Sequence, residues 1–166
     1  MEVEEIINKM RKDSNFEVKK PCGYPTVMNG HVLPEDLKEF YRLCGGVDCY
    51  VNYGGFPISI LSPMEVKLSN LVLLGKKYSE DISSSWYLIA DAQDGNYISI
   101  DFGPSRLGRC YESFEYSHAV VGNCPIISLS FTELLYNLFK YKGDYFFWKN
   151  NNEFVNLGDA YDERSL

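Results

Sequence analysis

The stretch from Trp86 to Phe102, WYLIADAQDGNYISIDF, restricts the fold more than any other part of the sequence. Residues 86–90 are apolar at every position, which predicts a strand covered on both faces. Residues 97–102 alternate instead, and this predicts a strand with one buried face. Asp94-Gly95 between them is a strong turn signal, because glycine accepts a positive φ and aspartate tolerates it. We therefore expect a β-hairpin at the centre of a sheet. Its second strand should point Ile98, Ile100 and Phe102 into a core, and Tyr97, Ser99 and Asp101 outward.

The remaining elements follow from hydrophobic periodicity. Apolar residues recur at helical spacing within residues 2–13, 33–46 and 130–141, and Ser130 with Glu133 matches a capping box. Residues 14–33 have no regular pattern, whereas 66–78 fit a helix or a strand. Further strands are expected at 47–53, 56–61, 109–112, 120–121 and 126–129. Helices near both ends, with strands joined by short turns, predict an α+β domain with a mostly antiparallel sheet.

The length of 166 residues fits a single domain over residues 1–166, ending in a polar tail at 149–166. No apolar run reaches the roughly 18 residues that a membrane span needs. The N-terminus lacks the basic start and apolar block of a secretory signal. We therefore expect a cytoplasmic protein that does not enter a membrane.

Cysteine usage and charge exclude several classes of function. The cysteines are scattered without a C-x-x-C pair, so in a reducing compartment they are expected as small core residues. With only His31 and His118 available to help, neither a metal site nor a cofactor is expected. The net charge of −7 argues against nucleic-acid binding. It is compatible with a basic protein partner, although acidity also serves simply to keep a small protein soluble. The cysteines are Cys22, Cys44, Cys49, Cys110 and Cys124.

No hydrolase, P-loop or dinucleotide-binding motif is present in the sequence. His118 is expected as a surface or structural histidine. Asp91 and Asp94 would suit acid–base or metal chemistry. Aspartates beside a strand end more often accept hydrogen bonds from nearby backbone N–H groups, and we favour this role. Six tyrosines near turns or on outward strand positions fit either a protein interface or the edge of the core; they are Tyr24, Tyr50, Tyr53, Tyr97, Tyr111 and Tyr116.

Three blocks in fixed order resemble the SMI1/KNR4 family of the SUKH superfamily. LPEDLKEFYRLCGG at 33–46 is similar to the family's Leu-Pro helix that ends in a glycine turn. WYLIADAQDGNYISIDF is similar to its strand, Asp/Gly-rich turn and strand, and SFTELLYNLF at 130–139 to its closing helix. The resemblance covers residues 33–139. Two positions depart from the pattern: Asn96 follows Gly95 where the family often has aspartate, and Cys44 replaces the commoner asparagine.

The resemblance implies a binding role without catalysis. Bacterial members are commonly immunity proteins that bind and silence a cognate toxin, often a nuclease, whereas fungal members regulate cell-wall synthesis through protein contacts. Our first hypothesis is an immunity protein whose acidic, tyrosine-bearing surface docks on a basic toxin domain. The expected partner-binding residues are the carboxylates Asp91, Asp94, Asp101 and Glu112, with Tyr97 and Tyr111 as aromatic anchors.

Two alternatives remain open from the sequence. One is a regulatory scaffold module of SMI1/KNR4 type that acts in cell-wall synthesis or signalling, for which the partner need not be basic. The other is an enzyme that uses Asp91 and Asp94.

Overall fold

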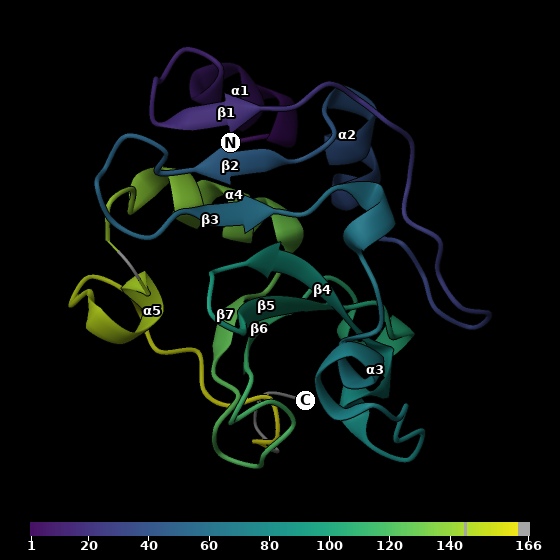
Figure 1. The fold of residues 1–166 in the computed structure, drawn as a ribbon. Helices are drawn as coiled ribbons and strands as arrows, with labels where there is room; N and C mark the ends of the chain where they lie inside the picture. The colour runs from purple at the N-terminus through teal and green to yellow at the C-terminus, as the bar shows by residue number, and fades with distance from the viewer. Residues whose placement is uncertain (145, 163–166) are drawn as a thin grey trace.

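The strands form one antiparallel sheet in which every strand pairs with the next along the chain (Figure 1). The computed structural model describes residues 1–144 and 146–162. This architecture confirms the predicted α+β class. The seven strands are β1 (Phe16–Val18), β2 (Val47–Cys49), β3 (Ile58–Ile60), β4 (Trp86–Asp91), β5 (Asn96–Asp101), β6 (Cys110–Phe114) and β7 (Ile126–Ser128).

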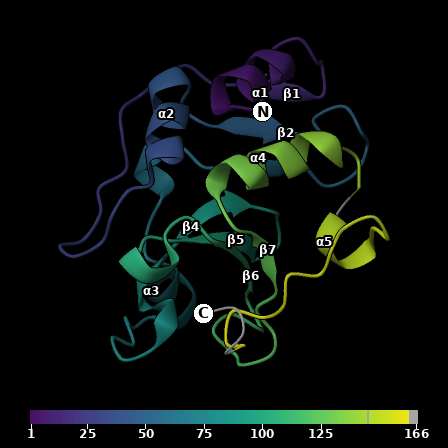
Figure 2. The same cartoon turned by 180° about the vertical axis from the view of Figure 1, so that it is seen from behind.

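Three helices cover one face of the sheet, which we call the helical face. They are α1 (Val3–Met10), α2 (Glu35–Leu43) and α4 (Phe131–Lys140). α4 lies behind the sheet in Figure 1 and in front of it in Figure 2, whereas α3 (Ser69–Leu74) and α5 (Phe147–Asn150) lie lower in both views. Each of the three has one apolar stripe, and these stripes merge with the inward side chains of the strands into one core. No helix among the described residues is both long and apolar enough to cross a membrane.

The predicted hairpin is confirmed as β4 and β5, with a shift of register between Leu88 and Ala90. Before the shift, Leu88 lies opposite Ser99, whereas after it Ala90 lies opposite Ile98. Because directly opposite residues share a face of the sheet, β4 exchanges its two faces at this bulge. Trp86, opposite Asp101, therefore belongs to the face away from α4, which we call the second face.

The second face of β4–β6 is also covered, by α3, by the loop at 115–125 and by the returning tail at 157–162. The amide of Ala160 donates to the carbonyl of Cys124 at 2.9 Å, and that of Ile126 donates to Gly158 at 2.9 Å. A separate small core forms there around Trp86 and Tyr111, with Ala160 packed into it. Residues 157–162 of the predicted polar tail thus pack on the sheet. Residues 163–166 of that tail lie outside the described residues.

Several local predictions need correction. The strand expected at 120–121 is absent, because this segment forms turns whose amides donate to nearby carbonyls. β1 lies within the segment 14–33 that was expected to be irregular. The ambiguous segment 66–78 contains the short helix α3. In α4 the Ser130 side chain accepts from the Glu133 amide at 3.1 Å, while Glu133 accepts from Leu129 rather than completing the expected capping box.

Gly45 and Gly46 follow the end of α2, in agreement with the glycine turn expected after this helix. The helix ends at Leu43, and Gly46 has a φ of +123°. A Cβ atom at Gly46 would lie 2.7 Å from the carbonyl oxygen of Ile60. Close approach of β3 and a positive φ therefore both require glycine at this position.

Candidate functional site

The turn between β4 and β5 carries two of the predicted partner-binding carboxylates. Asp91 accepts a hydrogen bond from the Gln93 amide at 2.8 Å, which is the turn role favoured for it above. Gln93, Asp94 and Gly95 all have positive φ, between 55° and 78°. Asp94 is exposed at the tip, and Asp91 is half-buried at the end of β4. The turn therefore presents Asp94 to solvent on a backbone that Asp91 helps to hold.

Tyr97 lies directly opposite Asp91 on the neighbouring strand. Its ring is half-buried. Burial raises the pKa of the Tyr97 phenol, and the nearby carboxylates of Asp91, Glu115 and Glu65 raise it further. Carboxylates from three separate segments therefore act on the Tyr97 phenol, with Asp91 contributing most and Glu65 least. We call Glu65, Asp91, Asp94, Tyr97 and Glu115 the acidic turn cluster.

The prediction that Asp101 faces outward is wrong, because the second face is covered at this point. Asp101 is only 1% exposed. Its carboxylate accepts hydrogen bonds from Ser85 Oγ at 2.7 Å, the Gly103 amide at 2.8 Å and the Tyr111 hydroxyl at 3.3 Å. Burial raises the pKa of this carboxyl although these donors oppose the shift. Asp101 therefore holds the scaffold together and does not reach a partner directly.

Tyr111 and Glu112 are likewise buried, and neither forms part of the surface. The Tyr111 ring stacks on Trp86 with centroids 4.2 Å apart. Glu112 points to the helical face, where Trp148 Nε1 donates to its carboxylate at 3.0 Å and Lys149 Nζ lies 2.9 Å away. The sequence suggested exposure because strand positions with polar groups usually face water. α5 and the tail instead return to cover them.

Apart from the hydrogen bonds of Asp101, the second face holds a continuous chain of hydrogen-bonded side chains. Ser99 Oγ bonds Ser69 Oγ at 2.7 Å and Ser113 Oγ at 2.6 Å. His118 then bridges Ser113 through Nδ1 at 3.0 Å and Asn70 through Nε2 at 2.7 Å. The chain continues from Asn70 through Ser83 and Asp81 to the Tyr161 hydroxyl.

His118 is thus structural, one of the two roles expected for it. It is 3% exposed, and burial lowers its pKa from 6.5 to about 4, so the imidazole is neutral at physiological pH. Ser113 beside it is fully buried. The hydrogen bonds of this serine–histidine pair satisfy buried polar groups, although His118 also borders a cavity of about 300 Å³ beside Asp81 and Ser83.

The other four tyrosines expected near turns or on outward strand positions are also either buried or exposed. Tyr50 is buried, and its hydroxyl donates to the Leu138 carbonyl at 2.6 Å. Tyr24, Tyr53 and Tyr116 are exposed. Of these three, Tyr24 is the one that borders a cavity.

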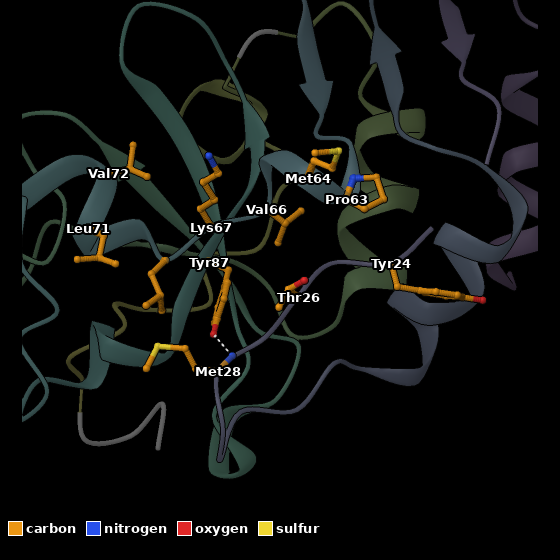
Figure 3. A pocket seen from close by; sticks show the side chains of 11 residues that line it. Tyr24, Thr26, Met28, Pro63, Met64, Val66, Lys67, Leu71, Val72 and Tyr87 are labelled. Carbon is orange, nitrogen blue, oxygen red and sulfur yellow. Dashed lines mark hydrogen bonds between the residues drawn. The ribbon is translucent and has the colours of Figure 1, made fainter. Parts of the chain in front are cut away.

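An apolar groove next to Tyr24 was not predicted from the sequence. It has a volume of about 520 Å³ and lies between the segment 24–28 and the segment 63–72 (Figure 3). Tyr87 contributes to its lining, and the Tyr87 hydroxyl accepts from the Met28 amide at 3.0 Å and bonds His31 Nδ1 at 2.7 Å. The lining residues are Tyr24, Thr26, Met28, Pro63, Met64, Val66, Lys67, Leu68, Leu71, Val72 and Tyr87.

A second acidic surface lies where α1 and α2 begin. Glu2, Glu4, Glu35 and Glu39 line a cleft of about 380 Å³ there. Lys38 and Arg42 form ion pairs with Glu35 and Glu39, so part of the negative charge is neutralised within α2. The helix dipole accounts for acidic residues in these first turns. This cleft is therefore a weaker candidate than the acidic turn cluster for recognition of a basic partner.

Comparisons with known proteins agree with the resemblance seen in the sequence. A model of the SMI1 / KNR4 family (SUKH-1) matches residues 28–137. The chain is 38% identical over 162 residues to Immunity protein YokJ of Bacillus subtilis (strain 168), covering 98% of this chain and 97% of that protein. No solved structure matches the chain. These matches cover most of the chain and not only isolated motifs. The chain therefore belongs to the SMI1/KNR4 family (SUKH-1).

Proposed function

We propose that this chain is an immunity protein of the cytoplasm, which binds a cognate toxin and neutralises it without catalysing a reaction. The observation that carries the proposal is the 38% identity to Immunity protein YokJ across nearly the full length of both chains. The structure supports a binding role, because the buried serine–histidine pair and the Asp91 carboxylate are both engaged in holding the fold.

The acidic turn cluster is the surface that we propose for contact with a basic toxin such as a nuclease. Asp94 is exposed at its tip, and Asp91 and Tyr97 are partly accessible beside it. A net charge of −7 favours encounter with a positively charged domain, since opposite fields raise the association rate. Of the six residues expected at the interface, these three remain proposed for contact. Asp101, Tyr111 and Glu112 are buried and are no longer proposed for contact.

Rescue of growth tests the function itself. The protein encoded by the gene next to that of this chain is expressed from an inducible promoter, without and with this chain. We expect arrest of growth in the first case and rescue in the second, together with a stable complex of the two purified proteins. Arrest that persists despite folded, abundant chain would reject the immunity function.

Titrations at rising salt test the acidic surface. We expect Asp94→Asn to lower affinity by about two- to fivefold, mainly through slower association, as a charge near the interface does. Glu17→Gln is the matched control, because Glu17 is exposed on β1 at the far edge of the sheet. Equal effects of both variants, or an affinity that does not change with salt, would show that the acidic turn cluster is not the electrostatic contact.

A further inference from the structure

Helix α3 has an amphipathic pattern that is inverted with respect to the protein. Its buried residues are Ser69 and Asn70, which join the polar chain beneath it. Its exposed residues include Leu71 and Val72, at 44% and 49% exposure. A surface helix normally turns its apolar side to the core. Leu73 of α3 packs against the core, whereas Leu71 and Val72 stay exposed among the residues that the structure describes.

The exposed side of α3 continues into the apolar groove. Figure 3 shows Leu71 and Val72 at one end and Met64 and Tyr24 towards the other. Met64 is 84% exposed, and Tyr24 is 56% exposed. Contiguous exposed apolar surface on a soluble protein commonly marks an interaction site. Methionine at both Met28 and Met64 suits such a site, because its flexible thioether adapts to the side chain that it meets.

The charges beside the groove indicate the chemistry of the partner. Glu65 lies in the sequence between two lining residues, Met64 and Val66, and its carboxylate is on an exposed residue beside the groove. Lys67 is the only charged residue among the lining residues. In Figure 3 its nitrogen lies at the end of the side chain far from Met28, so its carbon stem faces the groove. The groove is thus apolar along its length, with the Glu65 carboxylate beside it.

We propose that the groove receives a segment of the cognate toxin that inserts apolar side chains between Met64 and Val72 and places lysine or arginine beside Glu65. This inference rests on the proposed function and specifies its contact. Apolar anchors in a groove supply most of the affinity in such interfaces, whereas charges at the edge supply selectivity and rate. The occupant is accordingly a basic segment with apolar anchors.

Calorimetric titration with an inactivated variant of the toxin that this chain neutralises in the rescue experiment tests this assignment. The variant Met64→Gln/Val72→Gln removes apolar surface at two exposed positions and adds no charge. We expect it to bind at least about tenfold more weakly, as the loss of anchor residues requires, with unchanged thermal stability. Val121→Gln/Val155→Gln is the matched control, because both valines are exposed, at 73% and 74%, away from the groove.

A pair of charge variants tests the orientation of the segment. Glu65→Gln keeps a side-chain acceptor for the Ser62 amide, which Glu65 now holds at 3.0 Å. We expect Glu65→Gln to weaken binding by about two- to fivefold, and Lys67→Gln to bind at least as tightly as the wild type. Weaker binding by Lys67→Gln and no change in Glu65→Gln would overturn the proposed basic segment.

The outcomes separate the groove from the function. If wild type neutralises the toxin and the groove double variant binds with wild-type affinity, the groove assignment is wrong and the immunity function stands. If wild type neither binds nor rescues, both fail. Sedimentation of this chain alone completes the test: a dimer that is lost in the groove double variant would identify a second copy as the occupant and overturn the proposal.

Discussion

The two faces of the sheet are buried by different means. On the helical face, fully buried apolar side chains of the strands such as Ile100 share one core with those of α2 and α4, such as Phe40 and Phe131. On the second face, the serines, His118 and Asn70 are joined by hydrogen bonds beneath α3. The stability of an apolar face depends on how well its volume is filled, and many combinations of apolar residues can fill it. A buried polar chain depends on each partner, because one missing group leaves another unsatisfied.

Loss of volume on the helical face should have the largest effect. Phe131 is fully buried, and the centroid of its ring lies 4.9 Å from the centroid of the Phe40 ring. We expect Phe131→Ala to lower the free energy of unfolding by about 3–5 kcal/mol, because it leaves a cavity. Urea denaturation followed by circular dichroism measures this. Tyr136→Ala, on the exposed side of the same helix, should change stability by no more than about 0.5 kcal/mol; comparable losses in both would contradict the contrast.

Lowering the pH should destabilise the packing on the second face. Folded His118 stays neutral down to about pH 4, whereas in the unfolded chain it binds a proton below about pH 6.5. The unfolded state therefore binds more protons between these values, and stability falls as pH is lowered through this window. The shift corresponds to on the order of 3 kcal/mol. The carboxylate of Asp81 opposes it.

The variant His118→Gln isolates this contribution from those of the carboxylates. We expect wild type to lose more stability than the variant between pH 6.5 and pH 4, measured by urea denaturation at each pH. Parallel pH profiles for the two proteins would show that the buried imidazole does not control acid sensitivity.

Glu112 tests whether the helical face tolerates a polar exception. Trp148 Nε1 donates to its buried carboxylate at 3.0 Å. Glu112→Ala leaves that indole N–H unpaired, so we expect a loss of about 1–3 kcal/mol. Glu112→Gln retains an acceptor and should lose less. Tryptophan fluorescence during urea denaturation reports the change, and a larger loss for the glutamine variant would assign the effect to Lys149 and charge instead.

The tail should give the smallest effect of the four. The Tyr161 hydroxyl donates to Asp81 at 2.7 Å, where the polar chain ends. We expect Tyr161→Phe to lower stability by about 1 kcal/mol, the usual net value of one hydrogen bond. Tyr116→Phe is the control, since Tyr116 is 94% exposed. If the two variants are equally stable, the tail contact adds nothing to the second face.

The same contrast explains what could be predicted from the sequence. The helical face follows from local periodicity, because Ile98 and Ile100 alternate with polar residues and Phe131 begins a regular stripe. Asp101 gives the opposite local signal, since a polar residue at an alternating position normally faces water. What buries it comes from elsewhere in the chain, and so does the cover over Tyr111. The spacing of residues within β5 or β6 does not indicate that distant segments of the chain cover these side chains.

Only part of the candidate site could be predicted from the sequence, and the reason is related. Asp91, Asp94 and the turn between the strands follow from turn chemistry, which is local. The groove does not, because the periodicity of Leu71 and Val72 is the same whether a helix turns its apolar side inward or outward. The direction was set by Asn70, whose side chain meets His118 from a distant part of the chain.

The strict chain order of the sheet has a consequence for synthesis on the ribosome. Each strand from β2 to β7 finds its partner already made when it emerges, so the sheet and α1, α2 and α4 are complete once residue 140 is free. The contacts of Ala160 and Tyr161 come only afterwards. The cover that Ala160 and Tyr161 place over Trp86 therefore forms only after the sheet that it covers.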